Sequence, residues 1–328
     1  MLPRRSTELT GPIRRRRDAT LALLLVAAVL GQGAVTASAS GTSAAADPGY
    51  LHYVRSSPGE PSAIWSMRLD GSDDHVVVIP PSGSFGFAWS PDGSRIAFVR
   101  GVPEDGRIDY DIWVMGADGT QPMALTTHRG VEKHPTWSPD GQWIAFSRSL
   151  PHAMSIFRTR AVAPLGRATR LTWGATRRYV DVIDTSPAWS PTGDHIVFGR
   201  DHLSHITLED THTLGSVTAD GEFTRLGRRL GQPSWSPSGD RLAAINPGDC
   251  CNFSGPLFTL APDGSDVVQI VERDWEFFGT SFWARDAALI VFETSGSGCS
   301  QWWTVPSDGG AAPTPSPTPA CEEIVAWR

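Results

Sequence analysis

The segment Phe87–Arg100, FAWSPDGSRIAFVR, predicts a β-hairpin that recurs along the chain. A short strand ends at Trp89, the S-P-D-G stretch turns the chain, and alternating apolar residues from Ile96 onward form the returning strand. In such a turn proline fixes φ, aspartate bonds the backbone and glycine tolerates a positive φ. Four further copies follow, the last of them divergent: PTWSPDGQWIAFSR (135–148), PAWSPTGDHIVFGR (187–200), PSWSPSGDRLAAIN (233–246) and SFWARDAALIVFE (281–293).

A second hairpin follows several of these copies. Its strands alternate in polarity around an Asp-Gly pair, which is a strong hairpin signal. The clearest examples are residues 108–127, 212–227 and 255–271. Two hairpins per repeat make a four-stranded antiparallel sheet. Repetition of such sheets every ~40–50 residues predicts an all-β fold, a β-propeller.

The combined pattern resembles a known repeat family. W-S-P-D-G-x-x-I-A-F, followed by I-W-x-M-x-x-D-G and L-T, is similar to the WD40-like repeat of TolB-type propellers, over about residues 50–328. Unlike TolB itself, we expect no N-terminal α/β domain before the first blade. The resemblance implies the architecture and leaves the activity open.

The two ends of the repeat region are incomplete in complementary ways. Tyr50–Arg55 matches the returning strand of the repeat but lacks the tryptophan-bearing strand before it. The C-terminal segment IVAWR, residues 324–328, matches GFAWS (86–90). We therefore predict a six-bladed β-propeller of four-stranded antiparallel blades, closed by residues 324–328 completing the N-terminal blade.

The N-terminus predicts export. A basic cluster at residues 14–17 precedes an apolar run and small residues, which is typical of a signal peptide over residues 1–39, with cleavage between 37 and 46. A short disordered linker (40–48) and the propeller (49–328) follow. The alternative is an uncleaved anchor, because the run approaches the ~20 residues of a membrane span. We expect a secreted or extracytoplasmic envelope protein without a membrane span after cleavage.

The charge balance argues against a nucleic-acid partner. The whole chain has a formal net charge of −7, and the predicted signal peptide is rich in arginine, so the remainder is more acidic still. The expected partner is a protein or a glycan of the cell envelope, bound by a monomer.

Strand order divides the loops between two faces of a propeller. The tight turns share one face, and the connections between second and third strands and between blades share the other, which we call the long-loop face. Loops of this kind on a rigid scaffold favour binding sites. The candidate ligand-binding residues there are Arg177, Arg178, Asp181, Asp184, His202, His205 and Trp275.

His202 and His205 are also candidate ligands for a divalent metal; otherwise no cofactor is expected. The alternative is an ordinary solvated loop set. The repeated tryptophans are predicted to pack between blades, and Asp92, Asp118, Asp140 and Asp263 to serve turns.

Four cysteines fall on the long-loop face. A Cys299–Cys321 bridge would brace the ring closure, and Cys250–Cys251 would be either a vicinal disulfide or free. The alternative pairs Cys299 with Cys250 or Cys251.

The sequence contains no G-x-S-x-G, H-E-x-x-H or P-loop motif. We therefore favour a non-catalytic propeller that binds a protein or glycan at the long-loop face. The alternative is a metal-assisted carbohydrate lyase or hydrolase with its site in the propeller funnel. That alternative requires Asp181, Asp184, His202 and His205 to converge.

Overall fold

The structure, a computed structural model, describes residues 49–55, 61–104, 106–162, 165, 167–173, 180–204, 211–246, 255–272, 281–295, 300–316 and 323–327. Residues 46–328 form one compact unit, to which all the described residues belong. The predicted signal peptide and linker lie outside them. Within these ranges the regular elements are all strands, and no helix could span a membrane.

Four sheets contain four antiparallel strands each. The first has the order β24-β1-β2-β3, with β24 (Glu323–Trp327), β1 (Tyr50–Arg55), β2 (Ala63–Arg68) and β3 (His75–Val78). The second comprises β4 (Ser84–Trp89), β5 (Arg95–Glu104), β6 (Arg107–Gly116) and β7 (Met123–Ala124). The third comprises β16 (Gly231–Trp235), β17 (Leu242–Ile245), β18 (Leu257–Leu260) and β19 (Val268–Val271). The fourth comprises β20 (Phe282–Trp283), β21 (Leu289–Ser295), β22 (Ser300–Pro306) and β23 (Thr314–Pro315).

The remaining strands form a single eight-stranded sheet. One half contains β8 (Glu132–Trp137), β9 (Trp143–Leu150), β10 (Ala153–Arg160) and β11 (Thr169–Arg170). The other half contains β12 (Val180–Trp189), β13 (His195–Ser204), β14 (Thr211–Thr218) and β15 (Phe223–Arg228). β10 and β12 join the halves as a parallel pair, with Ala153 opposite Val182 and Met154 opposite Ile183.

The prediction of six separate four-stranded blades therefore needs correction. The structure has four such blades and one eight-stranded sheet. The physical reason is the length of β12. Its first half stays paired with β13, and Val182 and Ile183 within it also pair along their other edge with Ala153 and Met154 of β10, which adds a short parallel ladder.

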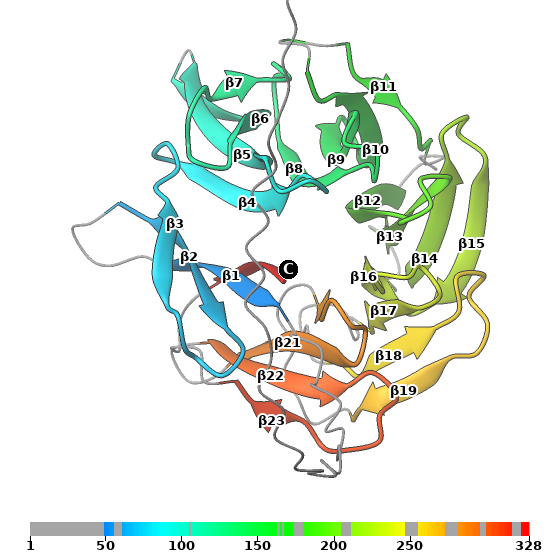
Figure 1. The fold of residues 1–328 in the computed structure, drawn as a ribbon. Helices are drawn as coiled ribbons and strands as arrows, with labels where there is room; N and C mark the ends of the chain where they lie inside the picture. The colour runs from blue at the N-terminus through cyan, green and yellow to red at the C-terminus, as the bar shows by residue number, and fades with distance from the viewer. Residues whose placement is uncertain are drawn as a thin grey trace, which may run out of the picture. The chain divides into compact units, whose positions relative to one another are not determined.

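The predicted ring closure is confirmed. β24 pairs antiparallel with β1, with Leu51 opposite Trp327 and Val54 opposite Glu323. β4, β8, β12, β16, β20 and β24 are the inner strands; each contacts the next, and β24 contacts β4. In Figure 1 the sheets follow one another around a ring, and the C-terminal strand lies beside the first strand of the chain.

The inner strands share a local irregularity. Each of β4, β8, β12 and β16 has one extra residue relative to its partner strand, just before the repeat tryptophan. At this bulge Gly86, His134, Ser186 and Gln232 have φ values of 60°, 55°, 50° and 48°. Such left-handed conformations are uncommon outside glycine, so the fold imposes the bulge.

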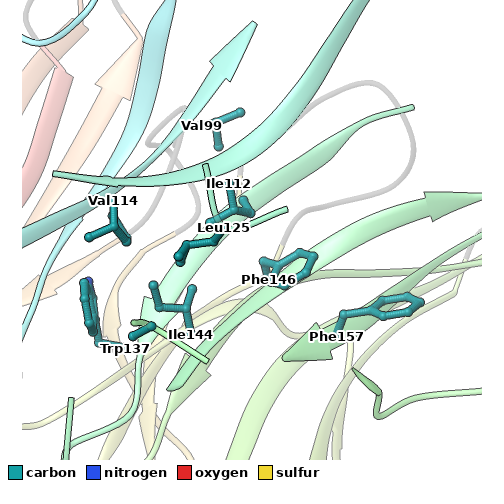
Figure 2. Close-up of a cluster of buried hydrophobic side chains, with 10 residues drawn as sticks. Val99, Ile112, Val114, Leu125, Trp137, Ile144, Phe146 and Phe157 are labelled. Atoms are coloured by element: carbon teal, nitrogen blue, oxygen red, sulfur yellow. The ribbon is translucent and has the colours of Figure 1, made fainter. Parts of the chain in front are cut away.

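The core lies between adjacent sheets. Figure 2 shows one cluster in which Val99 and Ile112 from the β4–β7 sheet face Trp137, Ile144 and Phe146 from the next strands. The tryptophan nitrogen is also satisfied there, because Trp137 Nε1 donates to the Ala88 carbonyl at 2.9 Å. Trp235 and Trp283 donate in the same way to Ala188 and Ser234, at 3.2 and 3.3 Å. The predicted packing of these tryptophans between blades is confirmed.

Candidate functional site

The aspartates of the repeat motif are structural. Asp92 accepts hydrogen bonds from Ser90 Oγ at 2.6 Å and from the Ser94 amide at 3.1 Å. The bond from Ser90, followed by those from Ser94, lowers the pKa of Asp92 to about 2. Asp118, Asp140 and Asp263 hold their own turns in the same manner. Their predicted role in the turns is confirmed, and it removes them from the candidate site.

Two acids of the inner strands form buried ion pairs. Asp184 is fully buried and accepts from Arg200 Nε at 2.6 Å and Nη2 at 2.8 Å. Glu132, also fully buried, accepts from Arg148 Nε at 2.6 Å and from Thr126 Oγ1. Burial raises the pKa of Glu132, and Arg148 opposes that rise. Both pairs tie an inner strand to the strand beside it.

The junction of β10 and β12 gathers histidines and carboxylates at the long-loop face. His152 Nδ1 lies 3.8 Å from Asp181 Oδ1, and His212 Nδ1 lies 2.7 Å from Asp201 Oδ1. The register places Asp181 opposite Leu203, and Asp201 opposite both Ile183 and His212. Because side chains alternate between the faces of a strand, Asp181, Asp201 and His212 share one side of the sheet. We call His152, Asp181, Asp201 and His212 the junction cluster.

The predicted residues do not all converge there. Asp181 and Asp184 are three residues apart on β12, so their side chains leave opposite sides of the strand. His202 lies opposite Val182, on the side of Asp184. Burial, followed by the charge of Arg200, lowers the pKa of His202. Arg177, Arg178, His205, Trp275 and the four cysteines lie outside the described residues.

Several residues of the long-loop face escaped the sequence reasoning. His152 sits in the β9–β10 turn and becomes relevant only through the β10–β12 pairing, which no local pattern signals. Asp109 and Asp111 on β6 are buried and hold the loop between β7 and β8. That loop carries His128, which lies in the segment HRGVEKH with its conspicuous pair of histidines. Among the described residues, no three His, Cys, Asp or Glu side chains are arranged to hold a metal.

His134 occupies the bulge of β8, and its lowered pKa predicts that the stability of the fold depends on pH. Desolvation by the surrounding protein, and then the charge of Lys133, lower its pKa to about 4. The residue is nevertheless exposed, so solvent screens part of this effect. In the unfolded chain the pKa is ~6.5. The unfolded state therefore binds the proton first, and the stability contributed by neutral His134 is lost as pH falls from about 6.5 to 4.

We accordingly expect His134→Gln to flatten the decrease in Tm between pH 6.5 and 4.5. Tm measured across this range for the wild type, His134→Gln and a control, His75→Gln, checks the expectation. His75 is an exposed histidine on β3. A slope that is the same in all three proteins would contradict it.

The strand topology and the repeated hairpins define an all-β propeller built from WD40-like repeats. The sequence model of the TolB beta propeller domain matches residues 42–216, which is more than half of the chain. The chain belongs to this TolB β-propeller family. No curated protein matches it in sequence.

Solved structures agree on the fold. TolB from Acinetobacter baumannii has a TM-score of 0.63 at 17% identity, covering 85% of this chain and 66% of that one. A protein assigned as TolB from Agrobacterium tumefaciens has a TM-score of 0.58 at 17% identity, covering 81% of this chain and 88% of that one. Oligogalacturonate lyase from Vibrio parahaemolyticus has a TM-score of 0.50 at 13% sequence identity. The match covers 81% of this chain and 71% of the lyase. This chain thus spans about two thirds of the Acinetobacter protein. At such identities the likeness shows the fold alone.

Proposed function

We propose that this protein is a secreted, non-catalytic β-propeller that binds a protein or a glycan at its long-loop face. The observation that carries the proposal is the junction cluster, two histidine–carboxylate pairs whose aspartates lie on the same side of the neighbouring strands β12 and β13. The aspartates of the repeat motif serve turns, whereas this cluster belongs to no repeat position. Carboxylate and imidazole groups supply the acceptors and donors that fix a polar ligand.

The connection that leads into β12 supports this location. It begins at Trp173, whose side chain is 63% exposed, with the Arg170 guanidinium 5.5 Å from the ring centroid. Exposed aromatic rings stack on sugars and anchor protein contacts. Arg177 and Arg178 follow in the same connection and belong to the proposed surface as anionic-ligand contacts.

The architecture and location form part of the proposal. We infer a ring of six blades, because β8–β11 and β12–β15 each repeat the strand order of the separate sheets and are joined by only two residue pairs. The N-terminal 39 residues are proposed to be the signal peptide, 40–48 the linker and 49–328 the propeller. The location would be outside the cytoplasm, with the protein monomeric, and a Cys299–Cys321 bridge at the closure.

Binding is tested with the purified chain on a glycan array and on envelope extracts, followed by titration of the captured component. We expect His152→Ala/Asp181→Asn to weaken binding at least tenfold. The matched control is His75→Ala/Asp73→Asn, which removes a second histidine–carboxylate pair, 3.5 Å apart, at the β2–β3 turn. Equal affinity of the two variants would reject the junction cluster as the binding site.

The second candidate is a metal-assisted carbohydrate lyase, favoured by the structural likeness to oligogalacturonate lyase. Its residues would be His202 and His205. Bound divalent metal in the purified protein, together with release of unsaturated uronate products, would replace the binding proposal with this one. Against it stands the position of Asp181 and Asp184 on opposite sides of β12.

A further inference from the structure

A second polar pair lies at the long-loop face, between β6 and the loop that joins β7 to β8. Asp109 is only 6% exposed. Its Oδ1 accepts a hydrogen bond from the Gly130 amide at 3.2 Å, whereas its Oδ2 is sealed from solvent and has no hydrogen-bond partner. A buried carboxylate oxygen without a hydrogen-bond donor lowers the stability of the fold, so a donor is expected near this atom.

His128 is the neighbouring group that can supply this donor. Its Nδ1 is likewise sealed from solvent and without a partner. The site of a Cβ on Gly130 would lie 3.7 Å from this nitrogen, so His128 Nδ1 and Asp109 Oδ1 both lie against Gly130. The charge of Asp109 also acts on the imidazole, opposing the fall in pKa that burial and Arg148 cause at His128.

The loop that carries His128 is firmly held. The His128 amide donates to Asp111 Oδ1 at 2.9 Å, and the Tyr110 amide donates to the Gly130 carbonyl at 3.1 Å. On the other side, the Val131 amide donates to Ser149 Oγ at 2.8 Å. A Cβ on Gly130 would lie 2.7 Å from that hydroxyl oxygen, so only glycine fits. These bonds fix the backbone of the loop beside Asp109, and a rotation of the His128 side chain would bring its unpartnered Nδ1 to the unpartnered Asp109 Oδ2.

We propose that His128, positioned by Asp109, is a ligand-binding residue that accepts a hydrogen bond from a ligand hydroxyl through Nε2. The buried Asp109 oxygen selects the Nδ1–H tautomer, since a neutral imidazole carries one donor and one acceptor. Nε2 then holds the lone pair. Unlike Nδ1, Nε2 is not sealed from solvent, and no residue in the described part of the chain bonds it.

This inference rests on the proposed binding function, because it assigns a further contact on the same face. Its chemical content is narrower: an Nε2 acceptor needs a hydrogen-bond donor from the ligand, and the hydroxyl groups of a glycan supply one. Asp109 acts through His128 and is a positioning residue. The role of Asp109 can be measured without any ligand, because it determines which ring nitrogen of His128 carries the proton.

The tautomer is measured by long-range ¹H–¹⁵N correlation spectra of the full chain labelled at histidine, with His128 assigned by its loss in His128→Gln. We expect the Nδ1–H tautomer in the wild type and a change of tautomer or a mixture in Asp109→Leu. Asp111→Asn is the control, since Asp111 bonds the His128 backbone and leaves the ring alone. An Nε2–H tautomer in the wild type, or one unchanged in folded Asp109→Leu, would overturn the pairing.

The ligand half is tested with methyl glycosides as probes, followed by chemical shifts of His128 Nε2. A shift that saturates in the wild type and a tenfold weaker affinity in His128→Gln support the proposal. If the tautomer is as expected but no glycoside shifts Nε2, the hydroxyl ligand is rejected. Failure of the junction-cluster variants to alter binding, with the His128 result intact, would reject only the proposed location of the main site.

Discussion

Deletion of residues 324–328 is expected to lower the free energy of unfolding by roughly 4 kcal/mol or more. β24 forms an antiparallel ladder with β1 and contacts β4 and β20. Its removal leaves β1 with an unpaired edge and opens the ring between the first and last sheets. For a domain of this size, such a loss lowers Tm by about 8–16 °C. Thermal unfolding followed by circular dichroism measures it directly.

Two variants separate ring closure from a general effect of shortening the chain. Deletion of Gly41–Ala45, in the stretch preceding β1, removes the same number of residues and is expected to leave Tm within about 1 °C. Ala326→Pro keeps the full length but removes the backbone N–H of a residue that pairs with His52. We expect it to reproduce part of the loss. An unchanged Tm in the 324–328 deletion would refute the closure.

The parts of this fold that could be predicted are those that depend on the conformational preferences of nearby residues and on the repeat pattern. The S-P-D-G turns follow from the conformations of proline, aspartate and glycine, and Asp92 bonds its own turn as that chemistry requires. The closure was also predictable, because a tryptophan-bearing strand was missing at one end of the repeats and present at the other. The first signal is local to one repeat, and the second follows from comparing the two ends of the repeat region with the complete copies between them.

The candidate site was predicted less well, since it depends on contacts between repeats. Asp181 and Asp184 were expected on a connection of the long-loop face, yet Val180 onward is strand, and its parallel pairing with β10 decides which side chains meet. Treated as loop residues, Asp181 and Asp184 were free to converge; as strand residues three apart they cannot. His152 and Asp109 joined the site through neighbouring strands, and no spacing along the chain signals such a meeting.

Asp184→Ala is the second variant with a large expected effect, a destabilisation of about 3–5 kcal/mol. Asp184 is fully buried, and the Arg200 side chain that it binds is only 10% exposed. Arg200 also stacks on Phe198 and Phe223, with its guanidinium carbon 5.4 and 4.4 Å from the ring centroids. Arginine does not lose its proton in a protein. The substitution therefore leaves an uncompensated charge between two aromatic rings, and denaturant unfolding measures the cost.

The double variant Asp184→Leu/Arg200→Met distinguishes that cost from a loss of packing. Replacing both partners with apolar side chains of similar volume removes the buried charges together, so stability should return to within about 1 kcal/mol of the wild type. Binding supplies the independent readout, because a brace that holds β12 to β13 has no direct contact with ligand. The double variant is accordingly expected to bind like the wild type. A stable Asp184→Ala protein that no longer binds would instead make Asp184 a ligand contact.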